Sequence, residues 1–151
     1  MLIYFLEQSI PFNSSDHSDT KIAGTEKTLI NIANELAKNK NLEIKVFNLF
    51  NSKEVINNVE WNNISNYNNS SFADVIIAFS DVNLFNNFKS KKKFLWSHSV
   101  QNLEKFIRKN QLLSYLKHKP VLILEGEFHL KNRSFITSFF GKKILKLAPD
   151  Y

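Results

Sequence analysis

The chain has 151 residues, with 20 Lys and Arg against 14 Asp and Glu, a formal net charge of +6 and 43% hydrophobic residues. This length predicts about one domain, and this composition is globular rather than disordered. The absence of cysteine excludes a disulfide scaffold, a thiol nucleophile and any cysteine-ligated metal site. No apolar run approaches the roughly 20 residues of a transmembrane helix, and residues 1–6 lack the basic flank of a signal peptide, so we expect a cytoplasmic protein.

A strand, a loop, a helix and a second strand are predicted in the first third of the chain. Residues 3–6 form a continuous apolar run, typical of a strand covered on both faces, and the polar residues 12–23 predict a loop. Over residues 25–38 the apolar side chains recur with helical periodicity. Residues 43–49 predict the next strand.

Polar residues dominate the segment that follows. Asn51 with Glu54 forms a weak capping-box pattern, which predicts the start of a short helix. Residues 57–71 are rich in Asn and low in complexity, and a short edge strand is expected within them at residues 59–64.

Strands and helices alternate again in the second half. Residues 73–79 and 93–96 predict buried strands, separated by a short helix around residues 82–88. Residues 101–117 have the periodicity of a second long helix, which Pro120 ends. The apolar positions in register on this helix are Leu103, Phe106, Ile107, Leu113 and Leu116.

Residues 121–124 and 144–147 predict two further strands, separated by a helix at residues 133–140 that Gly141 closes. Strands alternating with helices predict an α/β, Rossmann-like fold with a mainly parallel sheet and helices on both faces. Ligands of such sheets bind beyond the carboxyl ends of the strands. The loops expected at that edge are residues 8–24, 80–81, 97–101 and 125–132.

Three common nucleotide or hydrolase motifs are missing. The first strand is not followed by G-x-G-x-x-G, which disfavours an ordinary dinucleotide-binding domain. The sequence also contains neither a Walker A motif nor the G-x-S-x-G elbow of α/β-hydrolases.

Four segments together resemble one enzyme family. The first segment, AGTEKTLINIANELAKNKNLEIKVFNL, corresponds to the family's loop, helix and second strand. Gly24 and Glu26 occupy two positions of the family's Gly-Gly-x-Glu motif. ADVIIAFSD, FLWSHS and KKILKLAPDY follow in the family's order, with His98 at its histidine. This order resembles the N-terminal domain of family-4 retaining glycosyltransferases of the GT-B fold. The chain departs from the pattern at Ala23, which replaces the first Gly, at residues 125–127 in place of Ser-Glu, and at Pro149–Asp150, which lacks the intervening Asn-Gly.

The resemblance implies that residues 1–151 are a single acceptor-side domain, one half of a GT-B enzyme, without its C-terminal nucleotide-sugar domain. The whole enzyme would transfer a sugar from a nucleotide-sugar donor to a hydroxyl acceptor, a cell-envelope glycan or glycolipid, with no metal or other cofactor. Its partners would be the sugar or glycolipid acceptor and the missing donor domain, and this chain alone would be inactive. The alternative is a non-catalytic Rossmann-like binding or partner module.

The resemblance also assigns roles to two places at the carboxyl edge. Gly24 and Thr25 would face the donor diphosphate, a role that suits a helix start because free N–H groups and the helix dipole attract phosphate. The alternative there is a tight turn that needs glycine. His98 would be the catalytic residue, hydrogen-bonding the donor sugar or the acceptor, and the alternative is a histidine satisfied by local backbone.

Four more residues at strand ends are candidate acceptor contacts: Ser80, Ser99, Glu125 and Glu127. The two glutamates are two residues apart on an extended segment, so their side chains point the same way. They could supply a base for the acceptor hydroxyl, or form a solvated loop pair.

The basic residues allow two interpretations. The three lysines at residues 91–93 predict either contact with an anionic inner membrane face or a solvated strand start, and an AT-rich coding sequence would also raise the lysine content. Nucleic-acid binding is disfavoured because the aromatic residues fall in buried-looking runs rather than between basic residues. His118 lies at a basic helix end, where the helix dipole favours a cation.

Overall fold

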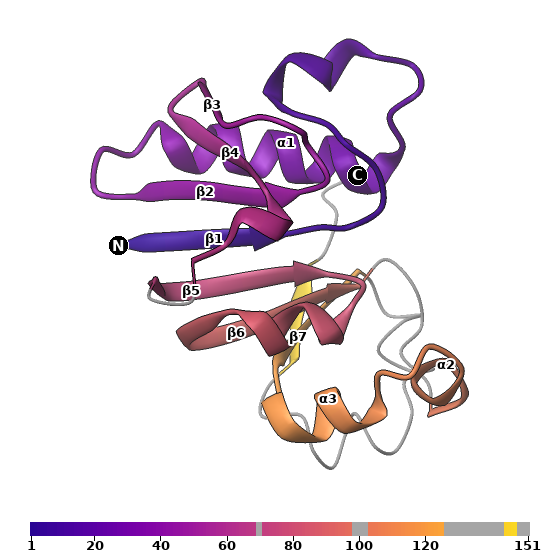
Figure 1. The fold of residues 1–151 in the computed structure, drawn as a ribbon. Helices are drawn as coiled ribbons and strands as arrows, with labels where there is room; N and C mark the ends of the chain where they lie inside the picture. The colour runs from indigo at the N-terminus through magenta and orange to yellow at the C-terminus, as the bar shows by residue number, and fades with distance from the viewer. Residues whose placement is uncertain (69–70, 98–102, 126–143, 148–151) are drawn as a thin grey trace.

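The computed structural model describes residues 1–68, 71–97, 103–125 and 144–147, the last segment and residues 103–105 and 125 by their backbone only. These residues form strands, α-helices and short 3-10 helices, the last labelled η (Figure 1). In chain order they are β1 (Leu2–Leu6), η1 (Ser14–Ser18), α1 (Gly24–Ala37), β2 (Glu43–Asn48), β3 (Glu54–Ile56), β4 (Val59–Asn63), η2 (Ile64–Asn66), β5 (Phe72–Phe79), η3 (Val82–Asn87), β6 (Lys89–Ser97), α2 (Leu103–Arg108), α3 (Leu112–His118), β7 (Val121–Glu125) and β8 (Ile144–Leu147).

One sheet of eight strands organises the molecule, in the order β3-β4-β2-β1-β5-β6-β7-β8. All neighbouring strands are parallel except β3 and β4, so the predicted mainly parallel α/β sheet is confirmed and is compatible with a Rossmann-like fold. The chain adds strands first on one side of β1 and then, from β5 onward, on the other. This reversal places a topological switch point between β1 and β5, whose carboxyl ends point to the same edge (Figure 1).

Two hydrophobic clusters hold the sheet, and β1 contributes alternate side chains to each. Ile3 and Phe5 pack with buried side chains of α1, whereas Tyr4 and Leu6 pack with side chains of η3, α2 and α3. This division follows from the strand itself, because successive side chains point to opposite faces. Burying one large apolar side chain contributes about 1.5–3 kcal/mol, so this five-residue strand fixes the centre of the core.

The expected short helix after Asn51 is wrong: Glu54 begins a strand instead. Strands β3 and β4 form an antiparallel hairpin in which Ile56 pairs with Val59. The two residues between them, Asn57 and Asn58, have φ values of 54° and 63°. A two-residue hairpin turn needs exactly such left-handed residues, and Asn tolerates them. The hairpin also means that β4, expected as an edge strand, lies between β2 and β3.

The long helix predicted over residues 101–117 is interrupted. Asn110 adopts φ of 54°, and this turn separates α2 from α3. The turn changes the helical register, so one apolar stripe cannot face the core along both pieces. Phe106 is fully buried, but Ile107 and Leu113, both expected on the buried stripe, are 60% and 78% exposed.

The remaining strands and the first helix lie within about two residues of their predicted positions, except that β6 begins four residues earlier than predicted. The short helix expected near residues 82–88 is the 3-10 helix η3. The helix predicted at residues 133–140 and its cap at Gly141 lie outside the described residues. Within the described part of the chain, no helix combines the length and apolar character needed to cross a bilayer.

Candidate functional site

A cavity of about 530 Å³ opens at the carboxyl edge of the sheet, beside the switch point. Its wall is built from the segments that follow three neighbouring strands. Residues 7–9 come after β1, Leu49 after β2, and Phe79 with residues 80–81 from the end of β5. Lys109 and Gln111 close the wall from the turn between α2 and α3. The cavity therefore lies where an open α/β sheet binds its ligand.

Two carboxylates meet at one serine on this wall. The Ser9 backbone N–H donates to Glu7 Oε1 at 2.8 Å, and the Ser9 hydroxyl donates to Glu26 Oε1 at 2.6 Å. Both glutamates are buried, with 4% and 5% of their surfaces exposed. The second oxygen of each carboxylate is buried and has no hydrogen-bond partner among the residues that the structure describes. Buried polar groups are rarely left unpaired in native proteins, so this pair marks the site as chemically unusual.

Burial raises the pKa of the Glu7 carboxyl above its usual value of 4.5, because the charged form loses hydration. The hydrogen bonds from Ser9 oppose this shift, and the nearby charge of Glu26 adds to it. Glu26 is in the first turn of α1, where the positive end of the helix dipole favours a negative charge. Glu7 therefore holds a proton more readily than an ordinary glutamic acid side chain does.

Ser80 occupies a strained turn on the opposite wall of the cavity. Its φ is 62°, and the Asp81 N–H donates across it to the Phe79 carbonyl at 2.8 Å. The Ser80 N–H donates to the Trp96 carbonyl at 2.9 Å, which ties the turn to β6. A non-glycine residue in this conformation costs of order 1–3 kcal/mol, and such strain clusters at functional sites.

The start of η3 links this wall to the turn between α2 and α3. Asp81 caps η3 by accepting the Asn83 N–H at 2.8 Å. The side-chain oxygen of the buried Gln111 accepts the Val82 N–H at 3.4 Å. The cavity thus joins residues from both halves of the chain.

The structure brings three of the predicted site residues to this region. Ser80 lines the cavity directly. Gly24 and Thr25 begin α1 immediately before Glu26, whose carboxylate accepts from the cavity-lining Ser9. The helix start is therefore next to the site, although neither residue is part of its wall.

Gly24 is not held by any local need for glycine. Its φ lies outside the left-handed region, and a Cβ at this position would meet no atom within 4 Å. A tight turn that requires glycine, the alternative considered for this residue, is therefore wrong. Among the described residues, nothing covers Gly24 at the first turn of α1.

The other candidate residues are not placed by the structure. His98, Ser99 and Glu127 lie outside the described residues, and Glu125 is known only as the last residue of β7. One premise for His98 does hold: β6, which ends at Ser97, is parallel to both of its neighbours. The last residue of β6, Ser97, therefore lies at the carboxyl edge of the sheet.

Sequence reasoning missed Glu7 as a site residue and used Glu26 only as part of a resemblance. A signal for Glu7 was present, because it is the first charged residue after a fully apolar strand. Gln111 had no such signal, since it was placed inside a continuous helix. Among the described residues, no group of three or more His, Asp or Glu side chains could hold a metal ion.

Comparisons of the chain with models of known protein families, with curated proteins and with solved structures found no match.

Proposed function

We propose that this chain is the acceptor-side domain of a glycosyltransferase, with the Rossmann-like arrangement of helices on both faces of its sheet. The observation that carries the proposal is the position of the cavity at the switch point between β1 and β5, within a sheet of the order 3-2-1-4-5-6-7 for its parallel strands. The order and spacing of the sequence segments that resemble family-4 enzymes support the same function.

The chemistry of the cavity wall suits a ligand with many hydroxyl groups. Carboxylates of Glu7 and Asp81 accept hydrogen bonds, Lys109 donates them, and Ser80 can do either. Leu49 and Phe79 add apolar surface beside these polar groups. A few convergent polar groups in a partly apolar cavity are what fix the orientation of a small ligand. The cavity would therefore bind the acceptor sugar.

The donor and the catalytic group would lie outside this cavity. The donor diphosphate would approach the start of α1 at Gly24 and Thr25, and the base and ribose would be held by a C-terminal domain. His98 would be the catalytic residue that hydrogen-bonds donor sugar or acceptor. Ser99, Glu125 and Glu127 would add acceptor contacts, and no metal ion would be required. The acceptor would be a cell-envelope glycan or glycolipid, which places the protein in the cytoplasm beside an anionic membrane face.

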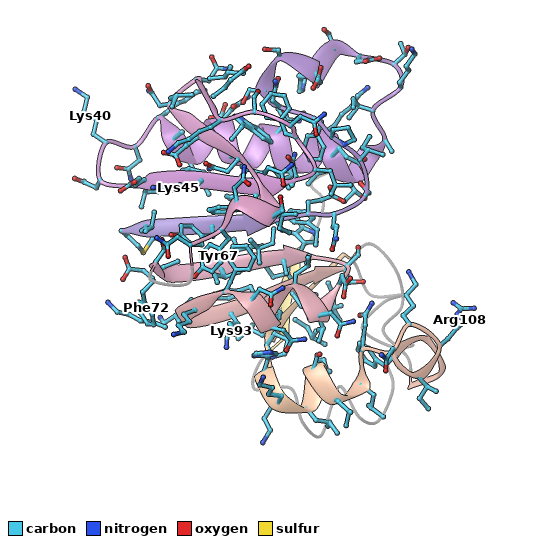
Figure 2. All side chains as sticks on the ribbon, in the orientation of Figure 1. Lys40, Lys45, Tyr67, Phe72, Lys93 and Arg108 are labelled. Atoms are coloured by element: carbon cyan, nitrogen blue, oxygen red, sulfur yellow. The ribbon has the colours of Figure 1, made fainter. Side chains whose placement is uncertain are left out.

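A binding experiment on the 151-residue chain tests the role of the cavity. We expect millimolar or tighter binding of neutral oligosaccharides, measured by NMR titration, and no binding of free nucleotide-sugars. Lys109→Ala should weaken binding because it removes a donor from the cavity wall. Arg108→Ala is the matched control, since Arg108 is the preceding basic residue and projects away from the body of the molecule (Figure 2). Equal effects of the two changes, or tight binding of nucleotide-sugars, would contradict the proposal.

A transfer experiment separates the enzyme from a non-catalytic binding module. The chain extended with a donor domain, where the reading frame encodes one, should transfer sugar from one member of a nucleotide-sugar panel. Oligosaccharide binding without transfer in the extended protein would favour the binding module.

A further inference from the structure

Glu7 is the most deeply buried charged residue in the described wall of the cavity. Only 4% of its surface is exposed, whereas Asp81 is partly buried and Lys109 is exposed. Its Oε1 accepts the Ser9 N–H at 2.8 Å, and no described residue donates to its Oε2. No ion pair to Glu7 occurs within the described part of the chain either. The described residues therefore balance its negative charge only in part, through hydrogen bonds.

Two further carboxylates add negative charge around this position. Glu26, which is 5% exposed, shares Ser9 with Glu7 by accepting the Ser9 hydroxyl at 2.6 Å. Its charge contributes to the raised pKa of Glu7. Asp81 belongs to another part of the wall, where its Oδ1 accepts the Asn83 N–H at 2.8 Å. A neutral N–H or O–H donor does not cancel the charge of a carboxylate, so this region is acidic in a chain whose net charge is +6.

Lys109 is the single cation in the described part of the wall, and it does not offset these charges. It is exposed in the turn between α2 and α3, and it forms no ion pair with a described carboxylate. A charge that stays in water interacts weakly with its neighbours, because solvent and salt screen it. A buried carboxylate is screened far less, so Glu7 dominates the electrostatics of the cavity.

We propose that this cavity binds a sugar that carries a protonated amino group. The inference rests on the proposed sugar site and names the chemical class of its acceptor. A hydroxyl needs direct contact with a free oxygen, whereas an ammonium group is attracted by Glu7 across several ångströms of poorly screened space. The covered Oε2 of Glu7 therefore does not prevent recognition of a cation. The volume of about 530 Å³ is within the range of roughly 300–1,000 Å³ that is usual for small-molecule sites.

Three monosaccharides that differ mainly at one position test the role of the charge. Glucosamine carries the ammonium group, glucose replaces it with a hydroxyl, and N-acetylglucosamine keeps the nitrogen without its charge. We expect glucosamine to bind the 151-residue chain about tenfold more tightly than the other two at pH 6.5, measured by NMR titration. Shifts of the Ser9 and Ser80 amide signals would locate binding at this cavity. Equal affinities for the three sugars would overturn the inference.

Charge variants identify the group that recognises the amine. Glu7→Gln keeps the shape of the side chain without its charge, so the preference for glucosamine should fall to about twofold or less. Glu54→Gln makes the same change of net charge at an exposed position of β3 and should keep the tenfold preference. A full preference in Glu7→Gln, or an equal loss in the control, would overturn the inference. The amide spectrum of each variant shows that it is folded.

Lys109→Ala provides a second test that leaves Glu7 in place. The substitution removes one donor for every sugar, but it also removes a positive charge that repels only the amine. The ratio of the glucosamine affinity to the glucose affinity should therefore rise, although glucose itself binds more weakly. A ratio that fell in this variant would overturn the inference.

Ethanolamine, an amine without a sugar ring, separates this inference from the proposed function. It should bind more weakly than glucosamine, because it lacks the ring hydroxyls. Ethanolamine binding as tight as that of glucosamine, and lost in Glu7→Gln, would support recognition of the amine and contradict the sugar site. Equal binding of glucose and glucosamine would keep the sugar site and overturn the inference. No binding of any of these ligands would overturn both.

Discussion

Glu7 and Glu26 are 19 positions apart in the sequence, yet both hydrogen-bond to Ser9, and each buries a second carboxylate oxygen that has no partner within the described part of the chain. The pair joins the end of β1 to the start of α1 at the edge of the cavity. Two partly unsatisfied carboxylates cost stability, since a buried acceptor without a donor loses its hydration. Glu7 lines the cavity, so a small side-chain rotation that let a ligand hydroxyl donate to its second oxygen would recover part of this loss, which is the physical argument for the proposed acceptor-sugar site.

Glu7→Gln should raise the free energy of unfolding at pH 7. Because the pKa of Glu7 is raised in the folded state, its stabilising contribution is present below the unfolded value of 4.5 and is lost as the pH rises through the folded value. At neutral pH the buried charged carboxylate therefore destabilises the fold. Replacing it should raise the free energy of unfolding by about 1–3 kcal/mol, the cost of an unsatisfied buried group. Urea unfolding at pH 4.5 and pH 7 measures the change.

The matched control for Glu7→Gln is Glu54→Gln, which alters an exposed carboxylate on the edge strand β3. It should change stability by no more than about 0.5 kcal/mol at either pH. A loss of stability in Glu7→Gln at pH 7 would contradict the account of Glu7 as an uncompensated charge.

Ser9→Ala should destabilise the protein, because Glu26 would lose the hydrogen bond from the Ser9 hydroxyl while remaining buried. The expected loss is about 1–3 kcal/mol, measured by thermal or urea unfolding. Ser52→Ala removes a hydroxyl that donates to an exposed Glu54 at 3.2 Å and should have little effect. If both changes had the same small effect, Ser9 would not be the link between the two carboxylates.

The sequence predicted the sheet well and the site incompletely, for one physical reason. Strands such as residues 73–79 are apolar on both faces, and that pattern is local. The hairpin at Asn57 and Asn58 depends on left-handed backbone, which Asn tolerates but does not require. In a segment with many Asn residues, the sequence therefore does not show which of them form the turn. The same holds for Asn110, which divides the second helix and thereby brings Gln111 to the cavity. Contacts such as that between Ser9 and Glu26 depend on how separate elements meet, which no local pattern records.

Gly24→Ala should stabilise the chain by about 0.4–1 kcal/mol, because the folded backbone accepts a Cβ there and alanine restricts the unfolded chain. Chemical unfolding measures this gain. If the glycine is kept for close approach of a donor diphosphate, the same change in the extended enzyme should reduce transfer while the fold becomes more stable. Destabilisation by alanine would show instead that the glycine serves the fold.

His118→Gln should remove a loss of stability that the native protein shows in acid. Burial, followed by the positive charges of Lys93 and Lys117, lowers the pKa of His118 from 6.5 to about 4. The cation expected at this helix end is therefore disfavoured, and the unfolded chain binds the proton at a higher pH than the folded one. The stability contributed by the neutral imidazole is therefore complete above pH 6.5 and is lost as the pH falls toward 4.

Glu7 acts in the opposite direction over the upper part of this window, since its raised pKa favours the folded state in acid. The two effects partly cancel in the native protein, and the single variants separate them: Glu7→Gln should steepen the loss of stability between pH 6.5 and 4.5, and His118→Gln should flatten or reverse it. His17→Gln, at an exposed histidine outside the cavity walls, is the control substitution. Unfolding free energies measured across this pH range that were the same for all three variants would show that neither buried group controls the acid response.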